Sequence, residues 1–569
     1  MSNRIRCLIQ KKVTATFNIP KSAVFSHLYF HFDIKRKVFS FELPLKTRSF
    51  DVKVENIKSF QPASLKEESN NLIKDVCIKE KNNIHTLSII MDRSNLVKEI
   101  LESNISSVSP PSLSSEVEKV IVEFSSPNIA KPFHIGHLRS TIIGNYIANI
   151  HSYLNNNVIK LNYLGDWGTQ LGLLQLGSDA LNIDLKNLKI NPLQELYRAY
   201  VHANKLLEAD PSIQEQARKI FSKTEHGDTN FLEQWNLFKK YTIPQLEQIY
   251  KRLGVKFDEY HWESNYSLKN SPQTIELIKK SGVLKKDGER RQVVEIGERI
   301  IPIFKSDGST LYLYRDIAAA IDRANKYNFD KMLYVVDNSQ HDHFNCLFEI
   351  LQRMKIPWVN KLQHIKFGKI YGMSTRQGTG IFLTDLLDEA NNILKKKQLD
   401  SSKTKVIPDM NDNSSDILGL SAIIIYELKQ RRQRDYKFSW DVALDMKGET
   451  GIKLQYTHCR LHNLKENCGV HLRKECNPSV LEEPIIDELI SLICKFDDII
   501  LFSFETLEAC YLAKYLFHLS HITNKALEQL RVKDQPEDIA TQRLLLFQVA
   551  KNILNTGMKL LCLTPLNKM

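Results

Sequence analysis

Residues 121–143 read IVEFSSPNIAKPFHIGHLRSTII, and this stretch decides the fold of the chain. The β-branched run at 120–122 predicts a strand, a short loop follows it, and the apolar residues of 138–150 predict a helix. In an open α/β sheet, ligands bind at the carboxyl ends of the strands, where this loop lies. The N–H groups and the positive dipole end at the start of a helix favour phosphate. The stretch therefore predicts a parallel sheet with a phosphate site between strand and helix.

Two histidines, His134 and His137, stand at the start of the predicted helix, three residues apart and therefore on one face. Two imidazoles beside a phosphate site can donate hydrogen bonds to negative charge that develops during phosphoryl displacement. The alternative is a pair of solvated histidines at a helix start. The four residues H-I-G-H by themselves leave both interpretations open.

The flanking residues favour the first interpretation. H-I-G-H resembles the HIGH signature of class I aminoacyl-tRNA synthetases, and the longer string EFSSPNIAKPFHIGHLRSTIIG is similar to that of one branch, the arginyl-tRNA synthetases. NYLGDWG at 162–168, DGSTLYLYRDIAAA at 307–320 and the ending GMKLLCLTPLNKM resemble the same branch. The resemblance extends over about residues 116–569 and is thin over the first hundred.

The composition is that of an ordinary globular protein, with 42% hydrophobic and 25% charged residues. No apolar run approaches the roughly 18–20 residues that a membrane span requires. The net charge of +12 suits a polyanionic partner, nucleic acid above all. Nine irregularly spaced cysteines without a C-x-x-C indicate a reducing compartment. The His and Cys residues of 458–476 fit no standard zinc module, so we predict no metal site.

The first twenty-two residues, MSNRIRCLIQKKVTATFNIPKS, contain arginine and lysine but no acidic residue, and their apolar residues recur at roughly helical spacing. Starts of this kind are typical of mitochondrial targeting. The alternative is a basic first strand or helix of an N-terminal domain. Helped by the resemblance, we predict the mitochondrial matrix, with the cytoplasm as the alternative.

Alternating strands and helices over 116–395 predict a Rossmann-like, doubly wound parallel sheet. We expect its strands at 158–164, 310–314, 332–336 and 364–370 besides the first. The predicted domains are an N-terminal α+β unit at 1–115, with the targeting segment and an additional tRNA-contacting domain; a class I catalytic domain at 116–397, with a helical insertion at about 176–300; a linker loop at 398–417; and an all-α anticodon-binding domain at 418–569.

Tyr312 and Asp316 lie at a predicted strand-to-helix junction. A carboxylate can hold a guanidinium in two parallel hydrogen bonds, although spacing alone favours Asp316 as a helix cap. The resemblance instead implies arginine binding, and the two carboxylates Glu123 and Asp316 would select a cationic side chain. The arginine-binding residues that we predict are Glu123, Ser126, Pro127, Asn128, His137, Tyr312, Asp316 and Gln340.

The resemblance also implies the catalytic residues. His134 and His137 would stabilise the pentavalent phosphate, and residues 371–380 take the place of the second class I signature, KMSKS. Only Met373 and Ser374 match it strictly; Thr375 stands where a lysine is usual, so we expect Lys131 or Arg376 to supply a cation to ATP. The predicted ATP contacts are His134, Gly136, His137, Asp166, Met373 and Ser374, and Met569 at the chain end is predicted to contact tRNA.

The implied function is that of an arginine–tRNA ligase with L-arginine, ATP and tRNA(Arg) as substrates, acting as a monomer. Mg²⁺ should accompany ATP rather than occupy a protein cage. Two alternatives remain: a class I synthetase for another amino acid, which two acidic pocket residues disfavour, and a catalytically silent RNA-binding relative, which the two histidines and the pocket residues disfavour.

Overall fold

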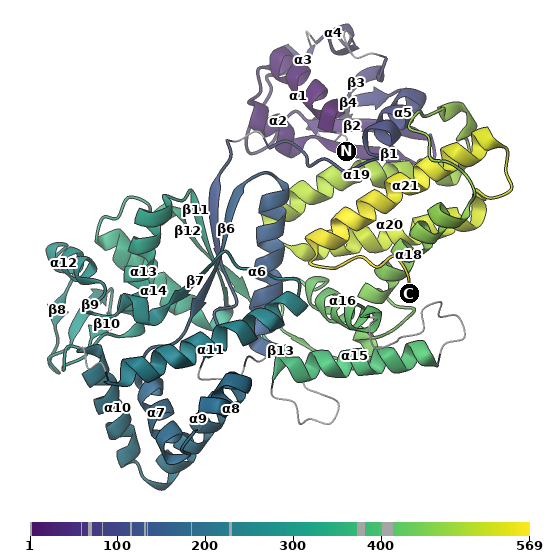
Figure 1. Cartoon of the computed structure of the whole chain (residues 1–569). Helices are drawn as coiled ribbons and strands as arrows, with labels where there is room; N and C mark the ends of the chain where they lie inside the picture. Colours follow the sequence, from purple (N-terminus) through teal and green to yellow (C-terminus); the bar gives the residue numbers. More distant parts are fainter. Residues whose placement is uncertain are drawn as a thin grey trace.

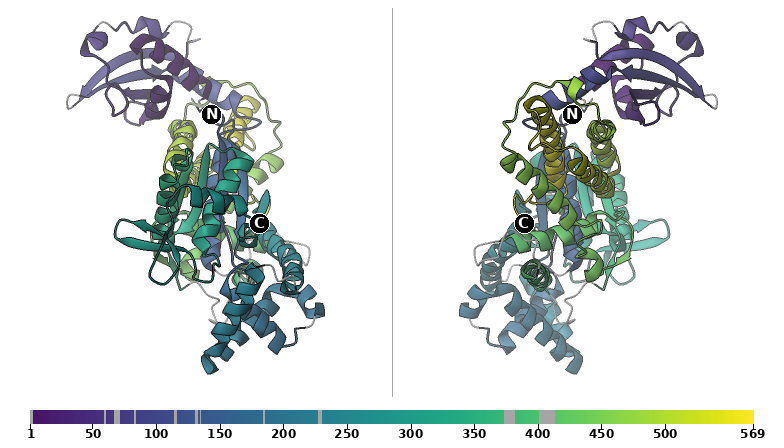
Figure 2. Two further views of the ribbon diagram at one scale, coloured as in Figure 1. Left: turned by 90° about the vertical axis from the view of Figure 1, so that its left-hand side faces the viewer. Right: turned by 90° about the vertical axis from the view of Figure 1, so that its right-hand side faces the viewer.

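A five-stranded sheet lies at the centre of the molecule, with helical units around it (Figure 1). The N-terminal unit projects from one end of the molecule and the helices α7–α10 from the other (Figure 2). No described helix has the length and apolar character needed to cross a membrane. The computed structural model describes residues 3–58, 60–66, 71–81, 84–113, 116–129, 133, 135–183, 185–226, 230–372, 382–400 and 413–569.

All neighbouring strands of the central sheet are parallel, in the order β12-β11-β5-β6-β7. From β5 the chain passes through α6 (Ile135–Tyr153) to β6 on one side, and later returns to β11 on the other side. This reversal is the switch point at which doubly wound sheets bind ligands, so the predicted fold class is confirmed. The strands are β5 (Lys119–Glu123), β6 (Asn157–Leu164), β7 (Glu259–Trp262), β11 (Lys331–Asp337) and β12 (Leu362–Phe367).

Two expected elements differ from the structure. The strand expected at 310–314 is wrong, because α13 (Tyr312–Tyr327) begins there. The alternation of leucine and tyrosine at 311–314 has the two-residue period of a strand. The consecutive residues Leu313 and Tyr314 are nevertheless both buried, which is possible in a helix that packs against neighbours on two sides. Tyr312 and Asp316 are therefore one helical turn apart on the same face.

The insertion is the second difference. Its helices are interrupted by the short strand β7, which joins the central sheet beside β6, and a small antiparallel sheet occupies residues 285–304 in place of the expected helix. Its helices pack closely: a Cβ on Gly172 would overlap the carbonyl oxygen of Ala217, and a Cβ on Gly177 would overlap that of Ala199. The elements between β6 and α13 are α7 (Thr169–Ala180), α8 (Leu185–Ile190), α9 (Pro192–Ala209), α10 (Ser212–Glu225), α11 (Asn230–Arg252), α12 (Pro272–Lys280), η1 (Glu263–Tyr266), β8 (Lys285–Lys286), β9 (Gln292–Ile296) and β10 (Arg299–Phe304).

The basic N-terminal segment forms α1 (Asn3–Phe17), which packs on an antiparallel sheet in the order β1-β2-β4-β3. Its apolar face belongs to the core, with Ile5, Ile9, Val13 and Phe17 buried. The structure thus agrees with the alternative interpretation of this segment as the first helix of the N-terminal domain. The other elements of this unit include β1 (Tyr29–Asp33), β2 (Val38–Pro44), β3 (Ile73–Lys81), β4 (Ile84–Met91) and α5 (Arg93–Ser103).

Arg6 joins the N-terminal unit to the C-terminal helices. Its side chain is only 1% exposed, donates a 2.8 Å hydrogen bond to the Leu28 carbonyl oxygen and forms an ion pair with Asp498 of α19 (Pro484–Thr506). A second ion pair, Arg93 with Asp487 at 2.8 Å, joins α5 to the same helix. Buried charges of this kind require their partners, so they fix how the two units dock.

The C-terminal helices pack against the central sheet through α6, where Arg139 and Glu427 form a buried ion pair at 2.7 Å. The chain end returns to α18: His458 bonds the Leu566 carbonyl oxygen at 2.7 Å, and Met569 packs on the cluster that contains Leu444 and Ile452. The C-terminal helices include α16 (Ser414–Leu428), α18 (Gly451–Asn467), α20 (Ala509–Gln529) and α21 (Glu537–Leu560), and α15 (Leu383–Leu399) packs against α16. The helix α14 (His341–Arg353) instead connects β11 to β12 in the central sheet.

We expect Arg6→Ala to lower the free energy of unfolding by about 3 kcal/mol, because it leaves Asp498 without its buried partner. Urea denaturation followed by circular dichroism measures this change. The matched control is Arg4→Ala on the same helix, since Arg4 is 74% exposed and its 3.3 Å pair with Glu99 lies at the surface; its expected effect is below about 1 kcal/mol. Equal effects of the two substitutions would contradict the anchoring role of Arg6.

Candidate active site

A cavity of about 570 Å³ lies at the carboxyl ends of β5 and β11, where the order of the sheet reverses. Its volume is within the range of roughly 300–1,000 Å³ that is usual for ligand sites. The tertiary structure brings residues from both halves of the sheet to one wall. The predicted arginine-binding residues that line the cavity are Glu123, Ser126, Asn128, Tyr312, Asp316 and Gln340.

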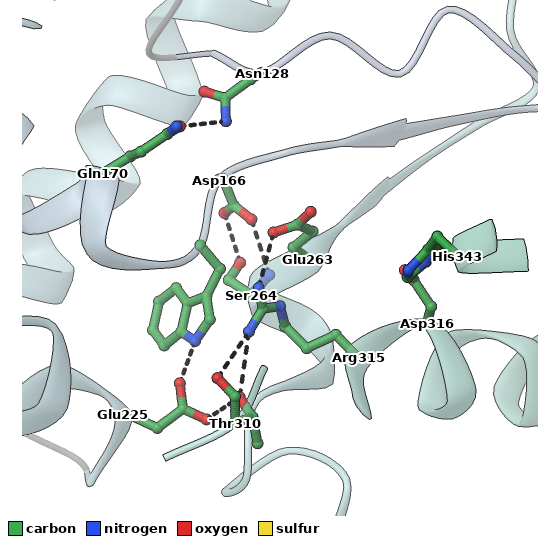
Figure 3. A network of polar contacts seen from close by, with 11 residues as sticks. Asn128, Asp166, Gln170, Glu225, Glu263, Ser264, Thr310, Arg315, Asp316 and His343 are labelled. Atoms are coloured by element: carbon green, nitrogen blue, oxygen red, sulfur yellow. Dashed lines mark hydrogen bonds and ion pairs between the residues drawn. The ribbon is translucent and has the colours of Figure 1, made fainter. Parts of the chain in front are cut away.

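The loop after β5 is held in an unusual conformation. Ser125 and Ser126 both have positive φ, 70° and 44°. The Ser125 N–H donates to the Ser140 hydroxyl at 2.9 Å, and the Ser126 N–H donates to the Asn162 side-chain oxygen at 3.1 Å. Such backbone strain persists only where surrounding contacts impose it, and it is concentrated at functional sites. Here it carries the chain toward Asn128, whose amide donates to Gln170 at 2.9 Å (Figure 3).

Two carboxylates of the cavity are paired with arginines that the sequence analysis did not identify. Glu123 forms a buried ion pair with Arg323, and Glu263 lies 3.5 Å from Arg315. Burial raises the pKa of Glu123, although the charge of Arg323 opposes this. Burial likewise raises the pKa of Glu263 to about 7, against the charge of Arg315. The available signal was the presence of two arginines on the otherwise apolar face of α13.

Asp316 differs from these carboxylates because its partner is a histidine. Its Oδ2 lies 2.6 Å from Nε2 of His343, at the start of α14. Burial lowers the pKa of His343, but the hydrogen bond to Asp316 and the charges of Asp316 and Glu263 outweigh burial, so the pKa is raised overall. Both predicted carboxylates therefore line the cavity, but Glu123 is paired with an arginine and Asp316 with a histidine, so the selection of a cation by the two together stays a prediction.

Asp166 is buried behind the cavity wall. Its carboxylate accepts hydrogen bonds from the Ser264 N–H at 2.8 Å, the Ser264 hydroxyl at 2.6 Å and the Trp235 indole at 3.2 Å, and Lys239 lies 3.3 Å away. Figure 3 shows the two hydrogen bonds between Asp166 and Ser264. These protein partners favour a structural role for the Asp166 side chain, and its contact with ATP stays a prediction.

The neighbouring Trp167 connects the cavity to the insertion. It lines the cavity and its indole donates to Glu225 at the end of α10. Glu225 also accepts a 2.9 Å hydrogen bond from the Thr310 hydroxyl, and Thr310 contacts Arg315 (Figure 3). The end of α10 in the insertion is thus joined through hydrogen bonds to residues that line the cavity.

The other predicted site residues lie elsewhere. Gly136 and His137 are in the first turn of α6, where the His137 ring stacks on Phe133 with centroids 5.4 Å apart. Neither His137 nor Pro127 is among the residues that line the cavity, so their contact with arginine stays a prediction. Met569 is partly buried against the C-terminal helices. The predicted residues outside the described part of the chain are Lys131, His134, Met373, Ser374 and Arg376.

Two family models match the chain. Residues 97–440 match the model described as "tRNA synthetases class I (R), catalytic domain". Residues 454–569 match the model described as "DALR anticodon binding domain". Together these matches include the central sheet, the cavity and the C-terminal helices.

Curated relatives resemble the chain over most of its length. It is 40% identical over 495 residues to a probable mitochondrial arginine–tRNA ligase of Homo sapiens, covering 85% of each chain. It is 38% identical over 470 residues to the cytoplasmic arginine–tRNA ligase of Saccharomyces cerevisiae, covering 80% of this chain and 77% of the relative. The mitochondrial enzyme of the same yeast is also 38% identical, with coverages of 79% and 72%.

Solved structures share the whole fold. The arginyl-tRNA synthetase of Plasmodium falciparum superposes with a TM-score of 0.75 at 23% identity, covering 100% of this chain and 99% of that chain. The arginyl-tRNA synthetase of Thermus thermophilus gives a TM-score of 0.77 at 19% identity, with complete coverage of both chains. At such identities the likeness concerns the fold alone.

We expect Asp166→Asn to lower the free energy of unfolding by about 2 kcal/mol, because an amide nitrogen would face donors that need an acceptor. The KM for ATP should change little in the same variant. The matched control is Asp179→Asn, at an exposed position where the carboxylate accepts only from Gln175 in the described structure; we expect less than about 0.5 kcal/mol there. Unchanged stability with a raised KM for ATP would instead indicate direct nucleotide contact.

Proposed function

The chain belongs to the class I arginyl-tRNA synthetases, and from this premise we propose how its cavity carries out the reaction. The enzyme is an arginine–tRNA ligase: it activates L-arginine with ATP and transfers the arginyl group to tRNA(Arg). The observation that carries the proposal is the position of Asp316, Tyr312 and Asn128 on one cavity at the switch point of the sheet.

We assign the guanidinium of the substrate to the Asp316 side of the cavity. A planar guanidinium fits a carboxylate in two parallel hydrogen bonds, and the Tyr312 ring lies on the same helical face, one turn earlier. Asn128 lies apart from Asp316 (Figure 3), on the segment that leads to α6. An amino acid with a cation at one end and a carboxylate at the other would span these two positions, with Glu123, Ser126, Pro127 and Gln340 as further contacts.

The carboxylate of arginine then attacks the α-phosphate of ATP in line, which breaks the bond to pyrophosphate and forms arginyl-adenylate. The first turn of α6 offers N–H groups and a positive dipole end to the phosphates. We assign His134 and His137 to the charge of the pentavalent phosphate, and Lys131 and Arg376 to the departing pyrophosphate. Gly136, Met373 and Ser374 are proposed ATP contacts, with Mg²⁺ bound by the phosphates.

In the second step the 2′-hydroxyl of the terminal adenosine of tRNA attacks the arginyl carbonyl, and AMP leaves. Positioning and electrostatics supply the rate in both steps, without a covalent enzyme intermediate. We propose that residues 418–569 bind the anticodon region, with Met569 in contact with the tRNA, and that residues 398–417 link them to the catalytic part at 116–397. We further propose that residues 1–115 also contact tRNA and that the enzyme acts as a monomer.

The cellular location that we propose is the mitochondrial matrix. The mitochondrial relatives support it, while the cytoplasmic relatives keep the cytoplasm as the alternative. Because the apolar face of α1 is buried in the N-terminal domain, we expect this helix to remain on the mature protein. Cell fractionation and N-terminal sequencing of the purified mature chain check both points; a mature chain that begins after Phe17 would contradict retention of the helix.

The decisive experiment is a charging assay. The purified chain should attach arginine to tRNA, and arginine should be the amino acid that supports exchange of pyrophosphate into ATP. Parallel reactions with mitochondrial and cytosolic tRNA identify the natural partner. Exchange supported by a different amino acid would favour the other class I alternative, and tRNA binding without exchange or charging would favour the silent RNA-binding relative.

In the same assays, Asp316→Asn should raise the KM for arginine about 100-fold, equivalent to about 3 kcal/mol, because the guanidinium loses its ionic partner. The matched control is Asp322→Asn, six residues along the same helix, where the carboxylate accepts from Tyr266 outside this cavity. Its KM for arginine should stay within about twofold of the unchanged chain. An unchanged KM in Asp316→Asn would refute the assignment of the guanidinium.

A further inference from the structure

Three acid–base pairs surround the cavity, and they differ in one chemical respect. Glu123 and Glu263 face the guanidinium groups of Arg323 and Arg315, which stay charged at every accessible pH. Asp316 faces His343, whose imidazole can lose its charge near neutral pH. Among the carboxylates that line the cavity in the described residues, Asp316 is thus the one whose partner can lose its positive charge while its side chain stays in place.

We propose that His343 is a positioning residue which holds Asp316 for the substrate and loses its proton when arginine binds, so that arginine binding releases a proton. This inference rests on the proposed function. The exchange balances charge: one guanidinium enters, one proton leaves the imidazole for solvent, and the carboxylate keeps a single cationic partner. No covalent bond forms or breaks in the protein.

The geometry allows both states of His343. Nε2 lies 2.6 Å from Oδ2 of Asp316, and the two side chains are 15% and 23% exposed, so the pair is shielded but reachable from the cavity. A neutral imidazole that keeps its hydrogen on Nε2 still donates to Oδ2. Oδ1 and the second lone pair of Oδ2 then stay available to the guanidinium. The ring of Tyr312, with its centroid 5.5 Å from that of His343, lies along the same wall.

An imidazolium and a bound guanidinium on one carboxylate would repel each other in this shielded place. The negative groups near His343 favour its proton in the empty site: burial lowers its pKa, but Asp316 and Glu263 raise it overall. A guanidinium that binds Asp316 adds a positive charge beside His343 and therefore favours loss of the His343 proton. The titratable and charged groups around His343 are Tyr312, Arg315 and Asp316 of α13, Glu263 of η1, Glu123 of β5 with its partner Arg323, and His341 and Asp342 of its own helix.

The sign of the pH dependence follows from this competition. Below the pKa of His343 the imidazolium occupies Asp316, and arginine must displace a proton, so its apparent affinity is low. As pH rises through that pKa the affinity should rise, with a limiting slope of roughly tenfold per pH unit for one proton, and it should level off above it. The KM for arginine should follow this course, whereas kcat at saturating arginine should not.

The test is calorimetric titration of the full chain with L-arginine at several pH values between 6 and 8, in two buffers with different ionisation enthalpies. The difference between buffers gives the number of protons released. We expect up to one proton for the unchanged chain and none for His343→Gln, whose amide nitrogen can donate to Asp316 but cannot titrate. His341→Gln, a change of a histidine on the same helix that does not line the cavity, should release protons like the unchanged chain.

The arginine KM of His343→Gln should also be independent of pH over this range, with kcat retained in the charging assay. The proposal is overturned if His343→Gln releases as many protons as the unchanged chain, or if the unchanged chain binds arginine and releases none. Both results can occur in a chain that charges tRNA with arginine, in which case the function stands and the role of His343 fails. A chain that neither binds nor charges arginine would instead refute the function itself.

Discussion

Charge compensation inside a shielded cavity is the constraint on which the site depends. Ionised groups taken out of water require partners at close range, and the cavity meets this need with Arg323 opposite Glu123 and Arg315 opposite Glu263. These two ion pairs keep the side chains of the cavity wall in place, because an arginine side chain does not lose its charge at accessible pH. Asp316, paired with His343, is the place where an added cation can be accommodated.

The same requirement connects the cavity with distant parts of the chain. Asp166 accepts hydrogen bonds from Ser264 and Trp235, while Glu225 links Trp167 to Thr310. The insertion helices, the segments after β6 and β7 and the start of α13 are thus joined by hydrogen bonds beneath the cavity. Farther out, the buried arginines Arg139 and Arg6 attach the C-terminal helices to α6 and to the N-terminal unit. The units of the molecule are therefore joined by specific buried polar contacts as well as by apolar packing.

Much of the fold follows from local pattern. Strands β5, β6 and β11 are short segments rich in apolar residues, and each is followed by a loop and a helical segment, so their order and the class of fold were predictable. The helix α13 was partly misread because alternating leucine and tyrosine at 311–314 has the period of a strand, and β7 was missed because four residues carry too little pattern. In each case the packing partners, which lie far away in sequence, decide the outcome.

The sequence by itself determined the parallel sheet, the family and six of the residues that line the cavity, because these depend on short-range periodicity and on motifs written in consecutive residues. Only the tertiary structure decided the partners of the charges: Glu123 is paired with Arg323, Asp166 accepts from Ser264 and Trp235, Asp316 is held by His343, and α1 is part of a core. These pairings join residues between 27 and 492 positions apart, and no local pattern encodes which distant charge will meet which. The physical reason is that burial and electrostatic partners are properties of the packed chain, not of its segments.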